Sequence, residues 1–189
     1  MITSYTPMAG ESLGKENYDT YMAKAGDTQQ SNSFRADNAQ RALDSYKTIQ
    51  LDINGFANSI GKLNSAELLL IENANAIKNH NYIEPAIKIA QYAREIQLDY
   101  ESLRLKYVER FNLQTDLLQT LVNNKGNIYS PPVLTKLKNA GARVPIIASE
   151  VKSLIEKIDK TSQEMSDSYF SLKGKSGLAD YPNKFIENK

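Results

Sequence analysis

Few residues in this chain have the types and spacing that catalysis or metal binding requires. The chain contains one histidine, His80, and no cysteine. His80 stands among asparagines in an expected turn, without a Glu-x-x-His or His-x-x-x-His arrangement around it, so we expect no zinc or di-iron site. The lack of cysteine excludes disulfides, thiolate nucleophiles and cysteine-ligated clusters. A hydrolase of the His-dependent kind would need His80 beside a nucleophile, and the sequence places none there.

Two other groups of residues resemble chemical motifs. Gly174-Lys175-Ser176 matches the end of a phosphate-binding loop, but the motif's first glycine is replaced by Tyr169. We interpret Gly174 as a helix C-terminal glycine instead. Glu95 and Asp99 share a helix face and could form a glycosidase pair, yet the lysines and arginines around them are typical of solvated helix faces. We therefore predict no catalytic residue, metal or cofactor, with a small enzyme whose site lies between helices kept as an alternative.

Six basic residues lie close together in the sequence between residues 136 and 160. This basic cluster consists of Lys136, Lys138, Arg143, Lys152, Lys157 and Lys160. Acidic residues lie among them, and the whole chain has 23 basic against 22 acidic side chains, so no overall field attracts nucleic acid. Nucleic-acid-binding surfaces are usually denser in positive charge and often carry aromatic platforms. We do not expect a nucleic-acid partner.

The apolar residues follow the spacing of long packed helices. Alternating spacings of four and three place one apolar residue per turn on a single stripe, which must be buried against another helix. The first long helix is expected to begin between Ser33 and Asp37 and to run towards Lys78, with a break near Gly61–Asn64 left open. Its packing seam includes Tyr46, Ile49, Ile53, Phe56 and Ile60.

Two more helical regions follow after turns. A connection over 79–82 and Pro85 predict an antiparallel helix from about residue 83 to 123, with Tyr100, Leu103 and Tyr107 on its seam. A short helix is expected over 131–140, ended by Gly141. Pro145 then opens the last long helix, which stops at Gly174 and has Val151, Leu154 and Ile158 on its seam.

These elements predict an all-α fold: an elongated antiparallel bundle of three long helices plus one short helix, with coiled-coil-like seams and extended terminal arms. The expected organisation is a polar N-terminal arm or linker over 1–32, a bundle domain over 33–174 and a C-terminal tail over 175–189. Aromatic residues on the arms are candidate contacts with other proteins: Tyr5, Tyr18, Tyr21, Tyr181 and Phe185.

The composition, 41% hydrophobic and 24% charged, is that of a folded soluble protein. The longest aliphatic run, residues 68–71, is far shorter than the roughly 20 residues that span a bilayer, so no transmembrane segment is expected. The first residues lack the features of a secretory signal. The expected location is therefore the cytoplasm, a virion, or outside the cell after export by a route that uses no signal peptide.

Because the chain carries seams and arms but no clustered chemistry, the sequence favours a non-enzymatic structural or assembly protein. It would act through helix faces and arms as a homo-oligomer or as part of a larger assembly, for example in a virion or a secretion apparatus. No small-molecule substrate is evident. The alternative is an exported helical effector or pore-forming component that engages a membrane or a host protein.

Overall fold

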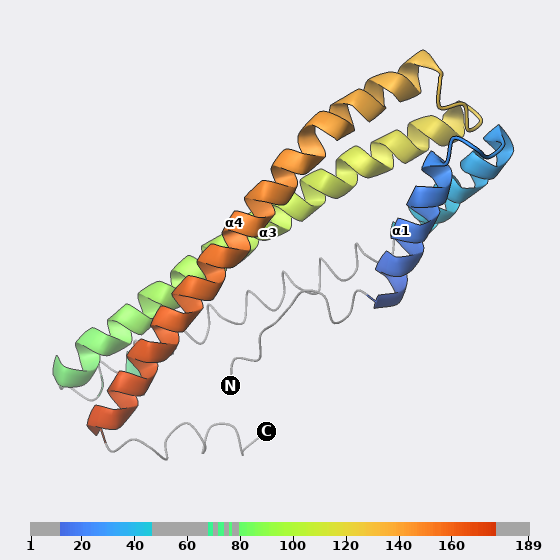
Figure 1. Cartoon of the computed structure of the whole chain (residues 1–189). Helices are drawn as coiled ribbons and strands as arrows, with labels where there is room; N and C mark the ends of the chain where they lie inside the picture. Colours follow the sequence, from blue (N-terminus) through green and yellow to red (C-terminus); the bar gives the residue numbers. More distant parts are fainter. Residues whose placement is uncertain (1–11, 47–67, 70–71, 74–75, 77–79, 177–189) are drawn as a thin grey trace. The chain divides into compact units, whose positions relative to one another are not determined.

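The computed structural model describes residues 12–46, 68–69, 72–73, 76 and 80–176, and its regular elements in these ranges are all α-helices (Figure 1). Helix α1 spans Ser12–Gly26, α3 spans His80–Asn123 and α4 spans Pro131–Ser176. A further helical segment covers residues 32–46. The all-α bundle predicted from the sequence is confirmed.

The chain divides into two compact units. Unit 1 comprises Met1–Asn58 and Arg104–Val151, and unit 2 comprises Ser59–Leu103 and Lys152–Lys189. The long helices α3 and α4 each contribute one part to unit 1 and another part to unit 2.

Helix α1 lies inside the segment that the sequence predicted as an arm, and was not foreseen. Its buried Tyr18 and Ala25 and its half-buried Tyr21 and Met22 have the i, i+3, i+4, i+7 spacing of one helix face. This face is only two turns long, which is too short to stand out as a period in the sequence. Residues 1–11 and 177–189, the remaining parts of the predicted arms, lie outside the described residues.

The helical segment 32–46 begins at a serine cap. The Phe34 amide donates to Ser31 Oγ at 3.2 Å, and the Arg35 amide donates to the Ser31 carbonyl at 3.1 Å. Serine at this position satisfies an amide that the first helical turn would otherwise leave unpaired. The predicted start, between Ser33 and Asp37, is therefore correct to within a residue or so. The continuation of this helix and the break considered near Gly61–Asn64 lie outside the described residues.

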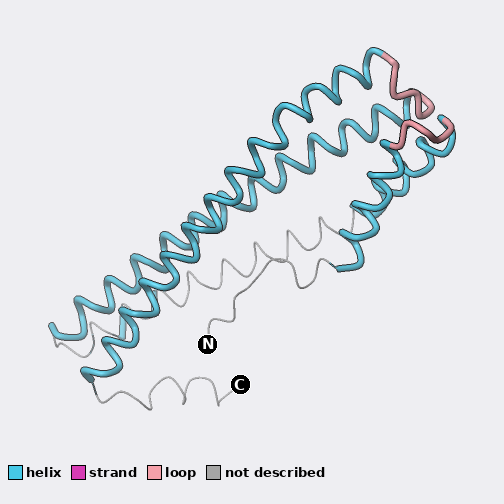
Figure 2. Tube along the Cα trace, in the orientation of Figure 1, coloured by secondary structure: helices cyan, strands magenta, loops and turns pink. Residues whose placement is uncertain are grey.

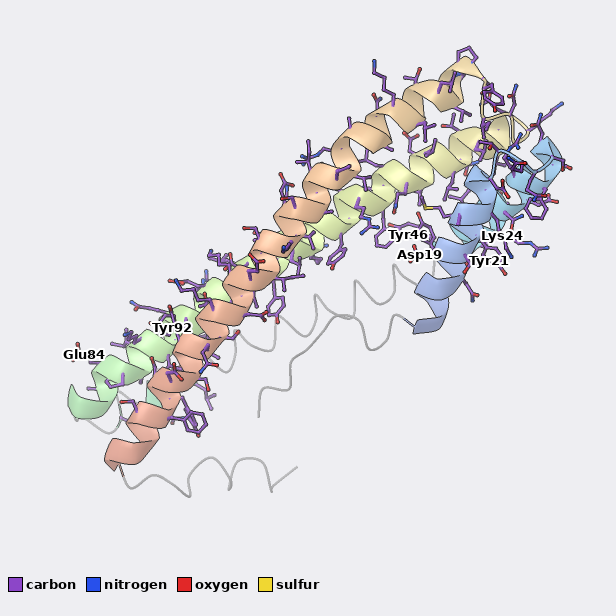
Figure 3. The ribbon with its side chains drawn as sticks, viewed as in Figure 1. Asp19, Tyr21, Lys24, Tyr46, Glu84 and Tyr92 are labelled. Atoms are coloured by element: carbon purple, nitrogen blue, oxygen red, sulfur yellow. The ribbon has the colours of Figure 1, made fainter. Side chains whose placement is uncertain are left out.

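The core of unit 1 forms where α1 and the 32–46 helix meet α3 and α4. Tyr18, Tyr46 and Phe111 stack edge to face or tilted, with ring centroids 5.2–6.3 Å apart. Aromatic pairs at such distances add favourable energy beyond the burial of area. Figure 3 shows Tyr46 between α1 and α3. The buried members of this core are Tyr18, Ala25, Ala39, Ala42, Tyr46, Leu118, Leu121 and Val133.

Helix α3 begins at His80, so this residue is helical and the prediction of a turn there was wrong. Pro85 is the sixth residue of this helix, so it removes the hydrogen bond that an N–H there would donate to the Asn81 carbonyl, yet the helix extends back to His80. The inward face agrees with the predicted stripe. The buried apolar residues of α3 are Ala86, Ile89, Ala90, Ala93, Ile96, Leu103, Leu118 and Leu121.

Helix α4 runs without interruption through Gly141 and Pro145, so the predicted short helix over 131–140 is the first part of a single long element. Glycine costs about 1 kcal/mol in a helix, and proline removes one hydrogen bond. Burial of Val133, Ala140 and Ile147 on the inner side of α4 offsets these costs. The helix also ends at Ser176, two residues beyond the predicted stop at Gly174.

Candidate interaction surface

Tyr18, which the sequence placed on an arm, lies in the core of unit 1. Its side chain is 1% exposed, and its hydroxyl donates to Gln114 Oε1 at 3.4 Å. Burial raises the pKa of this hydroxyl, because the charged form would lose its hydration. Tyr18 is therefore no surface contact. Tyr21 is half-buried on the same helix, with Lys24 and Arg41 each 5.9 Å from its ring centroid (Figure 3).

The seam residues that the structure describes lie on inward faces. Tyr46, Leu103 and Ile158 are buried. Half-buried residues border them: Tyr100, Tyr107, Val151 and Leu154. The other predicted residues lie outside the described part of the chain: Tyr5, Ile49, Ile53, Phe56, Ile60, Tyr181 and Phe185.

A second stripe runs along the exposed side of α4 in unit 1. Leu134 and Leu137 are 46% and 51% exposed, and Gly141, Pro145 and Ala148 are exposed as well. Spacings of three, four, four and three residues place these five on one helix face. We name this set the outer stripe. Scattered apolar side chains are normal on a protein surface, but a set at helical spacing is typical of a contact with another helix.

The middle of the outer stripe exposes bare backbone. A Cβ atom added at Gly141 would meet no neighbouring atom within 4 Å. Pro145 has no N–H to offer the Gly141 carbonyl, which therefore lacks its usual intrahelical donor. The outer stripe thus combines leucines at one end and small residues at the other, with open space beside Gly141 between them.

On another side of α4, ion pairs connect this helix to α3 within unit 1. Arg143 donates from Nε to Glu109 Oε1 at 2.6 Å and from Nη2 to Glu109 Oε2 at 3.0 Å. Lys106 Nζ lies 2.8 Å from Glu150 Oε2. Hydrogen bonds from Arg143 and from Lys106 lower the pKa of Glu109 and of Glu150, respectively. We name these four residues the ionic cluster; it connects α3 to α4 through charged side chains.

Most of the predicted basic cluster is paired with acidic residues. Lys136 Nζ lies 2.6 Å from Asp116 Oδ2, and Arg143 belongs to the ionic cluster. Lys152 and Lys160 each face a glutamate one turn away at 3.9 Å. Lys138 is exposed beside the outer stripe and takes part in none of these pairs. The positive charges of this region are therefore largely balanced by carboxylates of the same chain.

The expectation that Asp99 lies on a solvated face was wrong. Its side chain is only 8% exposed, and Oδ1 accepts from Lys157 Nζ at 2.8 Å within unit 2. Asp99 raises the pKa of Lys157 through this hydrogen bond. The other carboxylate oxygen, Oδ2, is buried without a hydrogen bond. Glu95, one turn away, is exposed as predicted, so the two carboxylates differ in their surroundings.

Two further kinds of feature concern metal binding and membrane insertion. No group of three or more histidine or acidic side chains there could hold a metal ion, and none of the described helices is long and apolar enough to span a membrane. No protein-family model, curated protein or solved structure shows a significant match to this chain.

Sequence reasoning missed the outer stripe for two reasons. The expected helix break at Gly141 separated the leucines from Pro145 and Ala148, so the common face was not visible. Small residues also carry little hydropathy signal. The spacing itself was present in the sequence and could have been found by continuing one helical register from residue 131 to residue 151.

Proposed function

We propose that this protein is a non-enzymatic assembly protein that acts through contacts between its helix faces and other protein molecules, as a component of a virion or a secretion apparatus would. The outer stripe supports this proposal most directly. It is a helix face whose two leucines, Leu134 and Leu137, keep 46% and 51% of their surface exposed in this chain.

The energy available from this face fits an assembly contact. Complete burial of a leucine side chain contributes about 1.5–3 kcal/mol, and both leucines are roughly half exposed. Covering them would then contribute on the order of 1 kcal/mol each. A contact of this strength is weak alone but becomes effective when many copies are linked.

Sedimentation velocity over a wide concentration range tests the proposal. We expect the native chain to associate and the variant Leu134→Ser/Leu137→Ser to associate at least tenfold less, with unchanged helicity by circular dichroism. Leu105→Ser/Ile146→Ser is the matched control, since these residues are 53% and 51% exposed but lie off the outer stripe. A native chain that stays monomeric at all concentrations would contradict self-assembly.

The alternative function, an effector that engages a membrane, predicts a different result for the native chain. Vesicle flotation with anionic liposomes would show the native chain bound to lipid while remaining monomeric in solution. Under the assembly proposal, the chain associates with itself and does not float with the vesicles.

A further inference from the structure

The positions of the outer stripe are spaced symmetrically about Gly141, and from this spacing we infer which molecule packs against it. Leu134 and Ala148 stand seven residues before and after Gly141, and Leu137 and Pro145 stand four before and after. We propose that the outer stripe packs against the same stripe of a second copy of this chain, antiparallel, with the two-fold axis at Gly141. This inference rests on the proposed assembly function and specifies its contact.

Side-chain size explains why the partner is a second copy. An antiparallel pairing about Gly141 places Leu134 opposite Ala148 of the other copy, and Leu137 opposite Pro145. Each large side chain thereby meets a smaller one, in both directions, as a two-fold interface requires. A parallel pairing would place leucine against leucine at one end and small against small at the other, leaving voids.

The backbone at the axis permits close approach. Gly141 carries no side chain, and the space where its Cβ would lie is open. Small residues at helix crossings let two backbones approach closely and gain dispersion contacts.

The charges around the outer stripe favour the antiparallel arrangement. In a parallel in-register pair, the exposed Lys138 of both copies would stand at the same level of the interface, which brings like charges closer together. In the antiparallel pair, Lys138 faces the uncharged segment that contains Val144 and Pro145. The other basic residues nearby, Lys136 and Arg143, are already neutralised by Asp116 and Glu109 of their own chain. Antiparallel helix dipoles also attract each other.

The area of this contact indicates a weak and repeated interaction. The outer stripe from Leu134 to Ala148 is about 21 Å long at 1.5 Å per residue, and a helix is about 10 Å wide. The two copies would bury on the order of 400 Å² in total, well below the roughly 1,200 Å² of a stable dimer. A second copy is therefore bound in a concentration-dependent manner, as one of several contacts in an assembly.

Cysteine cross-linking tests the register, since the native chain contains no cysteine. Leu134→Cys and Ala148→Cys are prepared separately, one of them with a mass tag, and mixed under mild oxidation at high concentration. We expect a disulfide-linked heterodimer at least tenfold more abundant than either homodimer. Asn139→Cys mixed with Ile146→Cys, both exposed on α4 but off the outer stripe, is the matched control and should not cross-link.

The variant Gly141→Leu tests the axis independently. A leucine there fills open space in one copy but collides with the other copy, so we expect at least tenfold weaker association together with a higher midpoint of thermal unfolding, because leucine favours helix over glycine. Ala142→Leu, the next exposed residue, is the control and should leave association within about twofold, since it lies off the stripe.

The results of these two experiments distinguish a failure of the antiparallel contact from a failure of the proposed assembly function. Homodimers formed by Leu134→Cys alone would show parallel packing and overturn the inference. Association of the native chain with no cross-link between Leu134→Cys and Ala148→Cys, or with Gly141→Leu as effective as the native residue, would also overturn it while leaving the assembly function intact. A native chain that never associates would overturn both.

Discussion

At the scale of single residues, two glycines differ in whether the fold has room for a side chain at their position. Gly126, in the turn between α3 and α4, has a φ angle of 74°, and an added Cβ would overlap the carbonyl oxygen of Asn32. Gly141 has open space around it. The fold of one molecule needs the first glycine and does not need the second, which is why we assign Gly141 to a contact between molecules.

Gly126→Ala should therefore destabilise the protein strongly. A positive φ costs a residue with a side chain about 1–3 kcal/mol, and the overlap with Asn32 adds to this cost, so we expect a loss of at least about 2 kcal/mol. Urea unfolding followed by circular dichroism measures the change. Gly26→Ala is the control, because the space around Gly26 is open; an equal loss in both variants would contradict the steric explanation.

Arg35 is the second residue on which unit 1 depends. It is buried, its Nε donates to the Gly126 carbonyl at 2.9 Å, and its Nη1 donates to the Asp27 carbonyl at 3.2 Å. Further hydrogen bonds reach the Gln30 carbonyl and Asn32 Oδ1. The guanidinium thus ties the turn over 27–31 to the turn over 124–130, the adjacent loops in Figure 2.

We expect Arg35→Lys to destabilise the protein nearly as much as Arg35→Met. A lysine keeps the charge but lacks the planar group that reaches several acceptors, and each buried acceptor left unpaired costs about 1–3 kcal/mol. Arg41→Lys, on the same helix but exposed, should change the free energy of unfolding by less than about 0.5 kcal/mol. A mild effect of Arg35→Lys would show that charge alone suffices.

At the scale of helices, the ionic cluster makes the packing of α3 on α4 sensitive to acid. The pKa values of Glu109 and Glu150 are lowered from 4.5 in the folded chain. A group with a lowered folded-state pKa contributes stability above its unfolded pKa, and this contribution is lost as the pH falls through the folded-state value. Between about pH 6 and pH 8 the contribution is constant.

The variant Glu109→Gln/Glu150→Gln should accordingly melt at a lower temperature than the native chain at neutral pH. The difference should shrink as the pH falls below about 4.5 and the native carboxylates become protonated. Added salt should shrink it as well, since the cluster is partly exposed and screened. A difference that persists unchanged at pH 2 would show that the variant acts through packing rather than charge.

The same helices show what could be predicted from the sequence. The inward face of α3 was predicted correctly because its large aliphatic residues recur with a regular period, as at Ile89, Ile96 and Leu103. Helix α4 was divided wrongly because Gly141 and Pro145 are local signals, which packing of the surrounding turns overrides. The burial of Asp99 could not be foreseen, since it depends on Lys157, 58 residues further along the chain. Exposure of the outer stripe likewise depends on which face the other helices cover.

At the scale of the whole molecule, the buried apolar residues that the structure describes lie mainly on the inward faces of helices. The charges of the chain are nearly balanced, at 23 basic to 22 acidic, so copies do not repel each other strongly. A weak two-fold contact at the outer stripe then needs further contacts to build an assembly. Exposed Phe170 on α4 in unit 2, and the predicted aromatic residues outside the described ranges, are places where such contacts are expected.

The most direct test of the assembly proposal is the solution mass of the native chain by light scattering over a hundredfold range of concentration, with helicity recorded on the same samples. We expect the mass to rise with concentration while helicity stays constant, and Leu134→Ser/Leu137→Ser to remain near the monomer mass of 21.2 kDa. A native chain that keeps the monomer mass throughout, or a variant that associates equally well, would contradict the account.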